Sequence, residues 1–573
     1  MQDFEFQRTD EVAGTWEPGE GAKWRTQEGA LFFLATWSEG PVQFGWFGIY
    51  HESLTHLDST ARDIAEAITR DASDRRRWSD LAELSNETPG WGLVRASREK
   101  LQLWRDPIGR LPIFRCRYRR GVEWGTRPEI LSGFEGKIRR SRLEEFLART
   151  RSERRDEFWQ NINRTRAGEY MVVDGHHRPA FVDWWPGPFD GVSTHPNLEG
   201  RVRELLIEAA ERVARRGGRL VSMSGGVDSS LLLALLASQG WDVEAISMVE
   251  PTTSVFDERE VIERILEETG AQGHFFDIGG PMEWGKPEIH HYTSDYGPAN
   301  HSEAAYVRPF LNKAKKLIGF NDPQVVISGV GADQLFYCRK LVLERDYMCV
   351  SKGCNQAFEK LRWKALIKHG VRLSGGKRVP VPSKIESSPS WLNIYNEDAL
   401  IRWGWSRVYS RHDWLKSRRA KFKSWAWESI VRFIEQYRRA TEVLYEWPYL
   451  TPSLAEFVFR LPPTVLRSDT HTKILLRNLL KCYVSEKIAF RRKQGVFDEV
   501  IWRGLGEHLT PSLEELLASP VWEKFEGLIE KKKLKKFVSR IRRNYDVVGR
   551  VDGHEFWRVI AVSLWVRERC GCR

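Results

Sequence analysis

A chain of 573 residues is too long for a single hydrophobic core, and its 25 Trp and 28 Phe exclude an intrinsically disordered protein, so several folded domains are expected. The net charge of +11 is gathered in Lys- and Arg-rich clusters, which we interpret as solvated helix faces and which do not by themselves predict a nucleic-acid partner. No apolar run approaches the roughly 20 residues of a membrane span, so we expect no membrane partner. The chain begins with no signal pattern and its seven cysteines are irregularly spaced, so we expect a cytoplasmic protein with reduced thiols.

The first part of the chain, residues 1–190, is rich in short runs of strand type separated by turn residues. These runs cover residues 30–37, 42–51, 91–97, 100–106, 112–119, 168–175 and 177–184. The pattern favours a sandwich of two sheets, with one helix over residues 59–73. Residues 184–197 are rich in Pro and Gly and predict a linker to a second domain, residues 198–573.

From residue 198 the pattern changes to alternating helices and strands. Helices are predicted over residues 198–216, 231–238 and 257–270, and strands over 219–224, 243–249, 273–278 and 324–329. Alternation at this spacing predicts a parallel sheet covered by helices, with a core over about residues 215–340. The rest, about residues 340–573, is predicted to be mostly helical and is rich in Trp and Arg.

A glycine- and serine-rich turn, "SMSGGVDSS" (residues 222–230, here called the phosphate loop), joins the first predicted strand of this sheet to an apolar helix. Glycines let the backbone approach an anion, and serine hydroxyls, exposed N–H groups and the helix dipole attract phosphates. Asp228 is out of place in a loop that binds only anions, and a bridging Mg²⁺ explains it best. A tight turn with Asp228 as a helix cap is the structural alternative. The expected nucleotide-binding residues are Met223, Ser224, Gly225, Gly226, Asp228, Ser229 and Ser230.

"SGGVDSS" resembles the pyrophosphate-binding loop of the ATP pyrophosphatase superfamily, whose members cleave ATP between the α and β phosphates and adenylate a substrate. A second segment, "VVISGVGADQLF" (residues 325–336), resembles the "SG-x-GAD-E-L-F" segment of the asparagine synthetase family. This resemblance implies that Asp333 joins Asp228 in holding Mg²⁺ on the departing pyrophosphate. It also implies that Ser328 and Gly329 contact the nucleotide, with the adenine near Met248.

Two further parts of the chain, one C-terminal and one N-terminal, resemble the same family. Residues 445–463, 471–480 and 491–498 resemble its C-terminal core, which implies that Lys493, in "RRKQG", neutralises charge on the adenylated intermediate. Lys473 and Arg477 match a basic pair just before it. Residues 101–131 resemble the signature of the family's glutaminase domain. The implied fold is multidomain: an N-terminal α+β sandwich of the Ntn glutaminase type, then an α/β parallel-sheet ATP pyrophosphatase domain (adenine nucleotide α-hydrolase-like) with helical C-terminal additions.

The sequence departs from this family at two positions. A glutaminase of this class uses an N-terminal cysteine as its nucleophile; here residue 2 is Gln2 and the first cysteine is Cys116, inside a predicted strand, so we expect an inactive glutaminase-like domain. Val330 stands where asparagine synthetase has a glutamate and β-lactam synthetase a tyrosine, and valine transfers no proton. A proton acceptor would then come from a nearby segment, where the candidates are His290, His291, His301 and Glu303, or the amine arrives neutral.

An adenylating enzyme without an ammonia source takes its amine from the substrate. Among family members that do so, the chain most resembles a lasso peptide cyclase, which implies that ATP adenylates an Asp or Glu side chain of a precursor peptide and the peptide's N-terminal amine closes the ring, releasing AMP and pyrophosphate. The implied cofactors are ATP and Mg²⁺, and the implied partners are the precursor peptide, a leader peptidase and a leader-binding protein. The alternatives are another asparagine synthetase-like amide ligase, a β-lactam synthetase, a tRNA-modifying ATP pyrophosphatase and a binding scaffold without activity.

Overall fold

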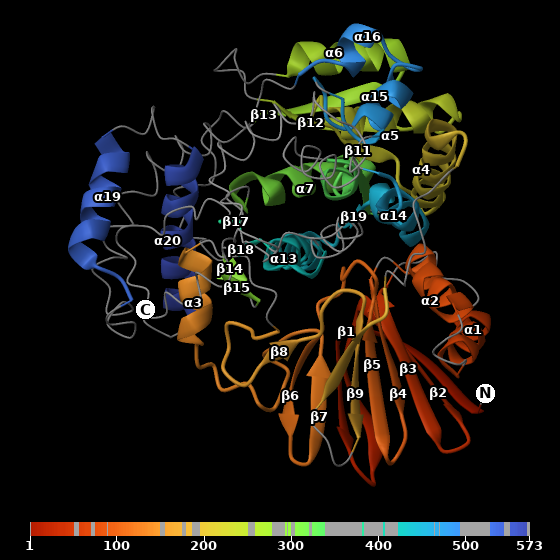
Figure 1. Ribbon diagram of the computed structural model, residues 1–573, viewed down its shortest axis with the longest axis vertical. Coiled ribbons are helices and arrows are strands. Elements are labelled where there is room, and N and C mark those ends of the chain that lie inside the picture. Colours follow the sequence, from red (N-terminus) through yellow and green to blue (C-terminus); the bar gives the residue numbers. More distant parts are fainter. Residues whose placement is uncertain are drawn as a thin grey trace, which may run out of the picture.

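The computed structural model describes most of the chain at the level of residues and side chains. The described ranges are 2–50, 57–69, 75–88, 90–148, 155–174, 179–185, 195–249, 258–277, 293–294, 296–298, 304–319, 324–337, 381–382, 405–406, 422–462, 465–468, 470–492, 528–543 and 550–569. Figure 1 shows two parts, a β-rich part in red and orange and a helix-covered sheet that follows it in the chain.

The N-terminal part is an antiparallel sheet that contains ten strands within the described ranges, in the order β10-β9-β5-β4-β3-β2-β1-β7-β6-β8. Its strands are β1 (Gln2–Glu17), β2 (Gly21–Glu39), β3 (Val42–Ile49), β4 (Trp91–Ala96), β5 (Lys100–Arg105), β6 (Phe114–Tyr118), β7 (Gly121–Gly125), β8 (Asn163–Arg164), β9 (Glu169–Asp174) and β10 (Ala180–Asp183). Each run predicted as a strand falls on one of them; β1, β7 and β8 were not predicted.

The sheet folds back on itself, so that strands near its opposite ends meet. The guanidinium of Arg115 on β6 lies 4.6 Å from the ring centroid of Phe181 on β10. The indole N–H of Trp16 on β1 donates to the carbonyl of Ser97, just after β4, at 2.7 Å. A register shift near Thr9, in the long β1–β2 pair, accompanies this change of direction. The predicted antiparallel sandwich is confirmed, with its two layers joined through β1 and β2.

Three helices flank this sandwich: α1 (Leu57–Thr69), α2 (Arg75–Glu87) and α3 (Arg140–Leu147). The helix predicted over residues 59–73 corresponds to α1, whereas α2 was not predicted. The predicted linker is wrong at its start, because Trp184 and Trp185 are buried in the core. The Trp184 indole donates to the carbonyl of Arg105 at 3.2 Å, and the Trp185 indole donates to Glu456 Oε1 at 2.9 Å.

The second part is built on a parallel sheet that has five strands in the described residues, in the order β13-β12-β11-β16-β19. These are β11 (Leu220–Ser222), β12 (Glu244–Val249), β13 (Gln272–Asp277), β16 (Val325–Ser328) and β19 (Leu444–Glu446). The predicted parallel sheet is confirmed. Its edge strand β19 was not predicted and lies in a region predicted to be mostly helical, because three residues are too few to show a strand pattern in sequence.

Helices α4 (Leu198–Arg215), α5 (Val227–Ser238), α6 (Arg259–Thr269), α7 (Ala304–Ile318) and α8 (Ala332–Phe336) connect and cover these strands. Residues 229–236 of α5 are all buried, because α5 packs against the sheet, α4, α6 and α15 at once, so its sequence is apolar on every side. Helix α6 ends where predicted, at Gly270, which is left-handed with a φ of 72°.

The described residues of the C-terminal region are mostly helical, as predicted. It contains α13 (Trp425–Thr441), the 3₁₀ helix η3 (Pro448–Leu450), α14 (Pro452–Phe459), α15 (Ile474–Leu480), α16 (Glu486–Ala489), α19 (Lys531–Arg543) and α20 (Arg550–Arg569). Two short antiparallel pairs, β14 (Thr293–Ser294) with β15 (Gly297–Pro298) and β17 (Val381–Pro382) with β18 (Trp405–Ser406), complete the described elements. Helix α20 returns to the N-terminal part and contacts α3 (Figure 1).

Buried ion pairs join the two parts through α13. Arg105, at the end of β5, pairs with Glu428 at 2.6 Å, and both side chains are almost fully buried. Arg432, one turn further along α13, binds Glu157 through two hydrogen bonds of 2.7 and 2.6 Å. Breaking a buried pair of this kind leaves an uncompensated charge, so these contacts fix α13 against the sandwich.

Candidate nucleotide site

The phosphate loop lies at the carboxyl end of β11 and leads directly into α5. Gly225 is left-handed with a φ of 67°, a conformation that glycine adopts without strain. The backbone N–H of Ser224 donates to the hydroxyl of Ser229 at 3.2 Å, and the Ser230 hydroxyl donates to the Gly226 carbonyl at 2.8 Å. Ser229 and Ser230 are buried, whereas Ser224 is exposed. These bonds shape the loop around the helix N-terminus, where anions bind.

The second glycine turn lies beside the phosphate loop because β16 pairs with β11, with Ser328 opposite Ser222. Gly329 favours this close approach: a Cβ at this position would lie 3.1 Å from the Cβ of Asp228, closer than an ordinary van der Waals contact. Gly331 is left-handed with a φ of 102° and is the N-cap of α8, whose first turn carries Asp333. The two acids predicted to act together are therefore brought to the same edge of the sheet.

Lys473 connects the two acids. Its Nζ lies 2.5 Å from Asp228 Oδ2 and 2.7 Å from Asp333 Oδ1. It is the N-cap of α15 and left-handed, with a φ of 56°, which is uncommon for a residue other than glycine. Burial opposes the charged form of Lys473, but the two carboxylates outweigh it and raise the pKa of the ammonium group. The sequence motif indicated Lys473 only as part of a basic pair, because no local pattern shows that it meets Asp228 and Asp333.

Asp228 and Asp333, here called the carboxylate pair, fit the requirements of a divalent cation. Both converge on one point, marked by the Lys473 ammonium, and carboxylate oxygens are the ligands that Mg²⁺ prefers when substrate phosphates complete its coordination. Within the described residues no group of three or more His, Cys, Asp or Glu side chains is placed to hold a metal ion. A metal bound here would thus need the phosphates as further ligands.

The beginning of the "RRKQG" segment lies close to the phosphate loop. Arg491 forms an ion pair with Glu258, whose side chain is next to Gly225. Arg477 donates to the carbonyls of Ala489 and Arg491 at 2.7 and 3.0 Å and so holds the backbone that leads to this segment. Lys493 itself lies outside the described residues, and its predicted role stays a prediction.

The other predicted residues are placed as follows. Met223 is buried at the end of β11, and its N–H donates to the carbonyl of Ile246 on β12 at 2.9 Å. Met248 is half-buried on β12. Their nucleotide contacts, and those of Ser328 and Gly329, stay predictions. Val330 is half-buried and packs against the main core, in keeping with a position that handles no proton. The alternative proton acceptors His290, His291, His301 and Glu303 lie outside the described residues.

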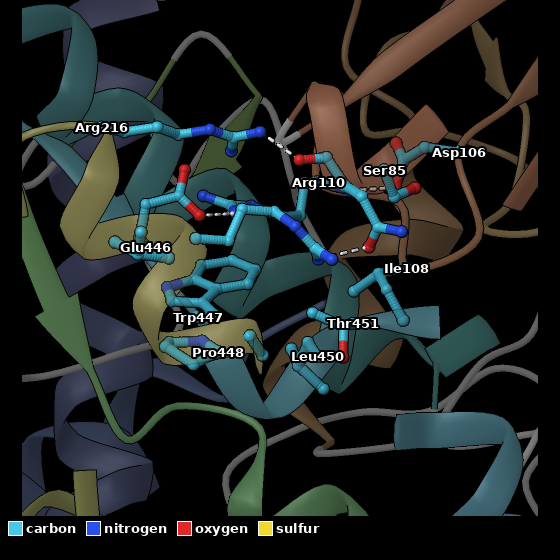
Figure 2. Close-up of a pocket in the computed structure, with 14 residues that line it drawn as sticks. Ser85, Asp106, Ile108, Arg110, Arg216, Glu446, Trp447, Pro448, Leu450 and Thr451 are labelled. Carbon is cyan, nitrogen blue, oxygen red and sulfur yellow. Dashed lines mark hydrogen bonds and ion pairs between the residues drawn. The ribbon is translucent and has the colours of Figure 1, made fainter. Parts of the chain in front are cut away.

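A pocket lies between the two parts of the molecule, beside residues 444–450, here called the β19–η3 segment. It is small, with a cavity volume of about 30 Å³, and is lined by α2, the loop after β5, α4 and residues 446–451 (Figure 2). Three arginines, Arg110, Arg212 and Arg216, contribute to its walls.

Three features lie at the carboxyl edge of the parallel sheet: the phosphate loop, a second glycine turn with an acid, and a lysine that bridges the two acids. This arrangement is typical of nucleotide-binding α/β enzymes. The chain belongs to the asparagine synthase family, whose model matches residues 201–567. The protein is therefore an ATP-dependent carbon–nitrogen ligase that forms amides, as the sequence motifs predicted, and members of this family generally use ATP and Mg²⁺.

No curated protein matches the sequence significantly. Among solved structures, the chain is similar to glutamine phosphoribosylpyrophosphate amidotransferase from B. subtilis complexed with ADP and GMP, with 9% identity, 51% of this chain and 77% of that chain covered, and a TM-score of 0.17. A structure of the allosteric regulatory enzyme of purine biosynthesis matches with 8% identity, covering 48% of this chain and 76% of that chain, with a TM-score of 0.18. TM-scores of this size carry no argument about function.

None of the helices in the described ranges is long and apolar enough to cross a membrane.

Proposed function

We propose that this ligase closes a ring within a peptide: it adenylates an Asp or Glu side chain of a precursor peptide and joins it to the peptide's N-terminal amine, as a lasso peptide cyclase does. The carboxylate displaces pyrophosphate from ATP to give an acyl-adenylate. The amine then displaces AMP, loses a proton and forms the isopeptide bond. The partners we propose are the precursor peptide, a leader peptidase and a leader-binding protein, in the cytoplasm.

The first step uses the phosphate loop and the carboxylate pair. The N–H groups at the start of α5 and the hydroxyls of the loop bind the phosphates and orient them. Mg²⁺, held by Asp228 and Asp333, would lower the charge of the leaving pyrophosphate. Lys473 already lies at the carboxylate pair and provides a fixed positive charge for the phosphates, and we propose Lys493 as a second cation for the adenylated intermediate.

The observation that carries the ring closure is the state of Cys116, which is the first cysteine in the sequence and lies in the N-terminal sandwich. Its side chain is buried, and burial together with the neighbouring Glu123 carboxylate raises the pKa of its thiol to about 12. Such a thiol supplies no thiolate near neutral pH to release ammonia from glutamine. An amine that is part of the substrate removes the need for ammonia, and Val330 removes the tyrosine expected of a β-lactam synthetase.

The test incubates the full-length protein with ATP, Mg²⁺ and a leaderless peptide with a free N-terminal amine and an internal Asp or Glu. We expect a product lighter by one water, together with AMP and pyrophosphate, measured by mass spectrometry. The N-acetylated peptide and the peptide with Asn or Gln in place of the acid are the matched controls and give no such product. The Asp333→Asn enzyme is the protein control, because it preserves the size of the side chain and removes its charge.

Two outcomes would overturn the proposal. Incorporation of added ammonia into the acid side chain, with no ring, identifies a plain amide ligase. AMP release that requires tRNA, with strong, salt-sensitive RNA binding, identifies a nucleotide-modifying enzyme.

A further inference from the structure

Arg110, in the loop after β5, reaches from the N-terminal sandwich across to the β19–η3 segment. Its guanidinium donates to Glu446 Oε2 at 2.9 Å and to the carbonyl of Tyr445 at 2.8 Å. It also lies 4.3 Å from the ring centroid of Trp447. Figure 2 shows Arg110, Glu446 and Trp447 together at the wall of the pocket. One side chain of the sandwich thus contacts three successive residues of the synthetase sheet edge.

The β19–η3 segment also contacts the residues of the nucleotide site. The hydroxyl of Tyr445 donates to the Ser222 hydroxyl at 2.8 Å, at the end of β11. The hydroxyl of Tyr449 donates to the main-chain carbonyl of Asp228 at 2.9 Å, in the first turn of α5. The side chain of Leu450 lies against Gly331, just before Asp333, in the space that a Cβ would need. The β19–η3 segment therefore contacts both turns that carry the carboxylate pair.

The loop that carries Arg110 is held in one conformation before it meets this segment. The buried carboxylate of Asp106 accepts from the backbone N–H groups of Gly109, Arg110 and Leu111 at 2.6, 3.0 and 3.2 Å. Gly109 is left-handed with a φ of 74°. Arg105, at the start of the loop, is fixed by its buried pair with Glu428. A rigid loop can transmit position, because little of the contact energy is lost to reordering it.

We propose that Arg110 is a positioning residue for the nucleotide site, and that the N-terminal sandwich sets the geometry of the carboxylate pair through Arg110 and the β19–η3 segment. The path runs from Arg110 to Glu446 and Tyr445, and from Tyr449 to Asp228. This role needs no thiolate and gives the sandwich a part in ATP binding. It is independent of which amine attacks the adenylate, so it stands whether or not the ring-closing function is correct.

The test measures binding of α,β-methylene-ATP with Mg²⁺ by isothermal titration calorimetry, using the full-length protein. Arg110→Met removes both hydrogen bonds and the guanidinium contact with Trp447 but keeps an unbranched apolar side chain, and we expect the Kd to rise about tenfold, within the range of coupling through packed networks. Arg110→Lys, which retains the charge, recovers part of the affinity. Thermal unfolding of each variant shows whether it is folded.

Arg212→Met is the matched control. Arg212 lies on α4 at the same pocket and also crosses between the two parts, donating to Asn86 Oδ1 at 2.8 Å, but no hydrogen bond joins it to the β19–η3 segment among the contacts described. We expect its Kd to stay within about twofold of the unchanged protein. Unchanged affinity in Arg110→Met, or an equal loss in Arg212→Met, would overturn the proposal.

Tyr449→Phe tests the far end of the path and keeps the test decisive if Arg110→Met does not fold. It removes only the hydroxyl that donates to Asp228, and we expect the same direction of change. In the double variant, a loss no larger than the larger single loss shows that both residues act through one path. Fully additive losses, or no effect of Tyr449→Phe, contradict it.

Discussion

Lys473 and Asp228 form an ion pair of 2.5 Å at the carboxyl edge of the parallel sheet, although they lie on different helices far apart in the sequence. The same ammonium group lies 2.7 Å from Asp333, so one lysine offsets part of the repulsion between the two carboxylates. One positive and two negative charges from three segments thus meet at the point where the motifs predicted phosphate chemistry.

Lys473→Met should abolish most of the ligase activity. Removing one preorganised cation from a partly buried site costs about a hundredfold or more in rate, which AMP release measures. Lys315→Met is the control. Lys315 forms an ion pair of 2.7 Å with Glu442, the same distance as between Lys473 and Asp333, but this pair lies on the surface. Retained AMP release in Lys473→Met would show that this lysine has no part in the reaction.

Gly331→Ala should impair both stability and activity, whereas Gly240→Ala should affect only stability, and slightly. Both glycines are left-handed, with φ of 102° and 78°, so each substitution carries a strain of about 1 kcal/mol. A Cβ at Gly331 would also clash with Leu450, while nothing lies within 4 Å of a Cβ at Gly240. Urea unfolding and AMP release separate the two effects. If both variants lose the same small amount of stability and keep AMP release, Leu450 moves aside for the new Cβ without disturbing the turn at Gly331.

Cys116 should resist alkylation in the folded protein up to high pH. Burial raises the pKa of its thiol from 9.0 to about 12, so the thiolate forms in the folded state only as the pH approaches the raised value. Raising the pH from about 7 to about 9 should therefore not increase its labelling by iodoacetamide, whereas the exposed Cys482 should be labelled in the folded protein. Peptide mapping by mass spectrometry measures both sites, and unfolding in urea should expose Cys116. Rapid labelling of Cys116 in the folded protein would contradict this prediction and show that the sandwich contains a reactive thiol.

Glu157→Gln should destabilise the protein by about 3 kcal/mol, because the buried guanidinium of Arg432 loses the carboxylate that it binds through two hydrogen bonds and keeps the longer contact with Glu428, at 3.8 Å. Chemical denaturation gives the free energy of unfolding. Glu260→Gln, in the exposed pair with Arg264 on α6, is the control and should change it by less than about 1 kcal/mol. A similar small change in both variants would show that the pairs of α13 do not hold the two parts together.

The sequence by itself predicted the fold class, the class of enzyme and the two turns that carry the carboxylate pair. The phosphate loop was recognised because an apolar strand, a glycine turn and a helix are consecutive in the chain, and the strands of the sandwich because alternation and turn residues are local patterns. The family match over residues 201–567 agrees with the motifs read from these segments.

Only the tertiary structure decided which distant residues meet. Lys473 joins Asp228 and Asp333 because α15 packs on α5 and because β16 pairs with β11, and no local pattern encodes those contacts. The short strand β19 exists because its neighbour β16 completes its hydrogen bonds, and Trp184 and Trp185 are core residues because other segments cover them. Arg110 touches the β19–η3 segment only after both parts have folded. In each case the deciding free energy comes from contacts between segments that are remote in sequence, so the residues themselves carry no local signal of it.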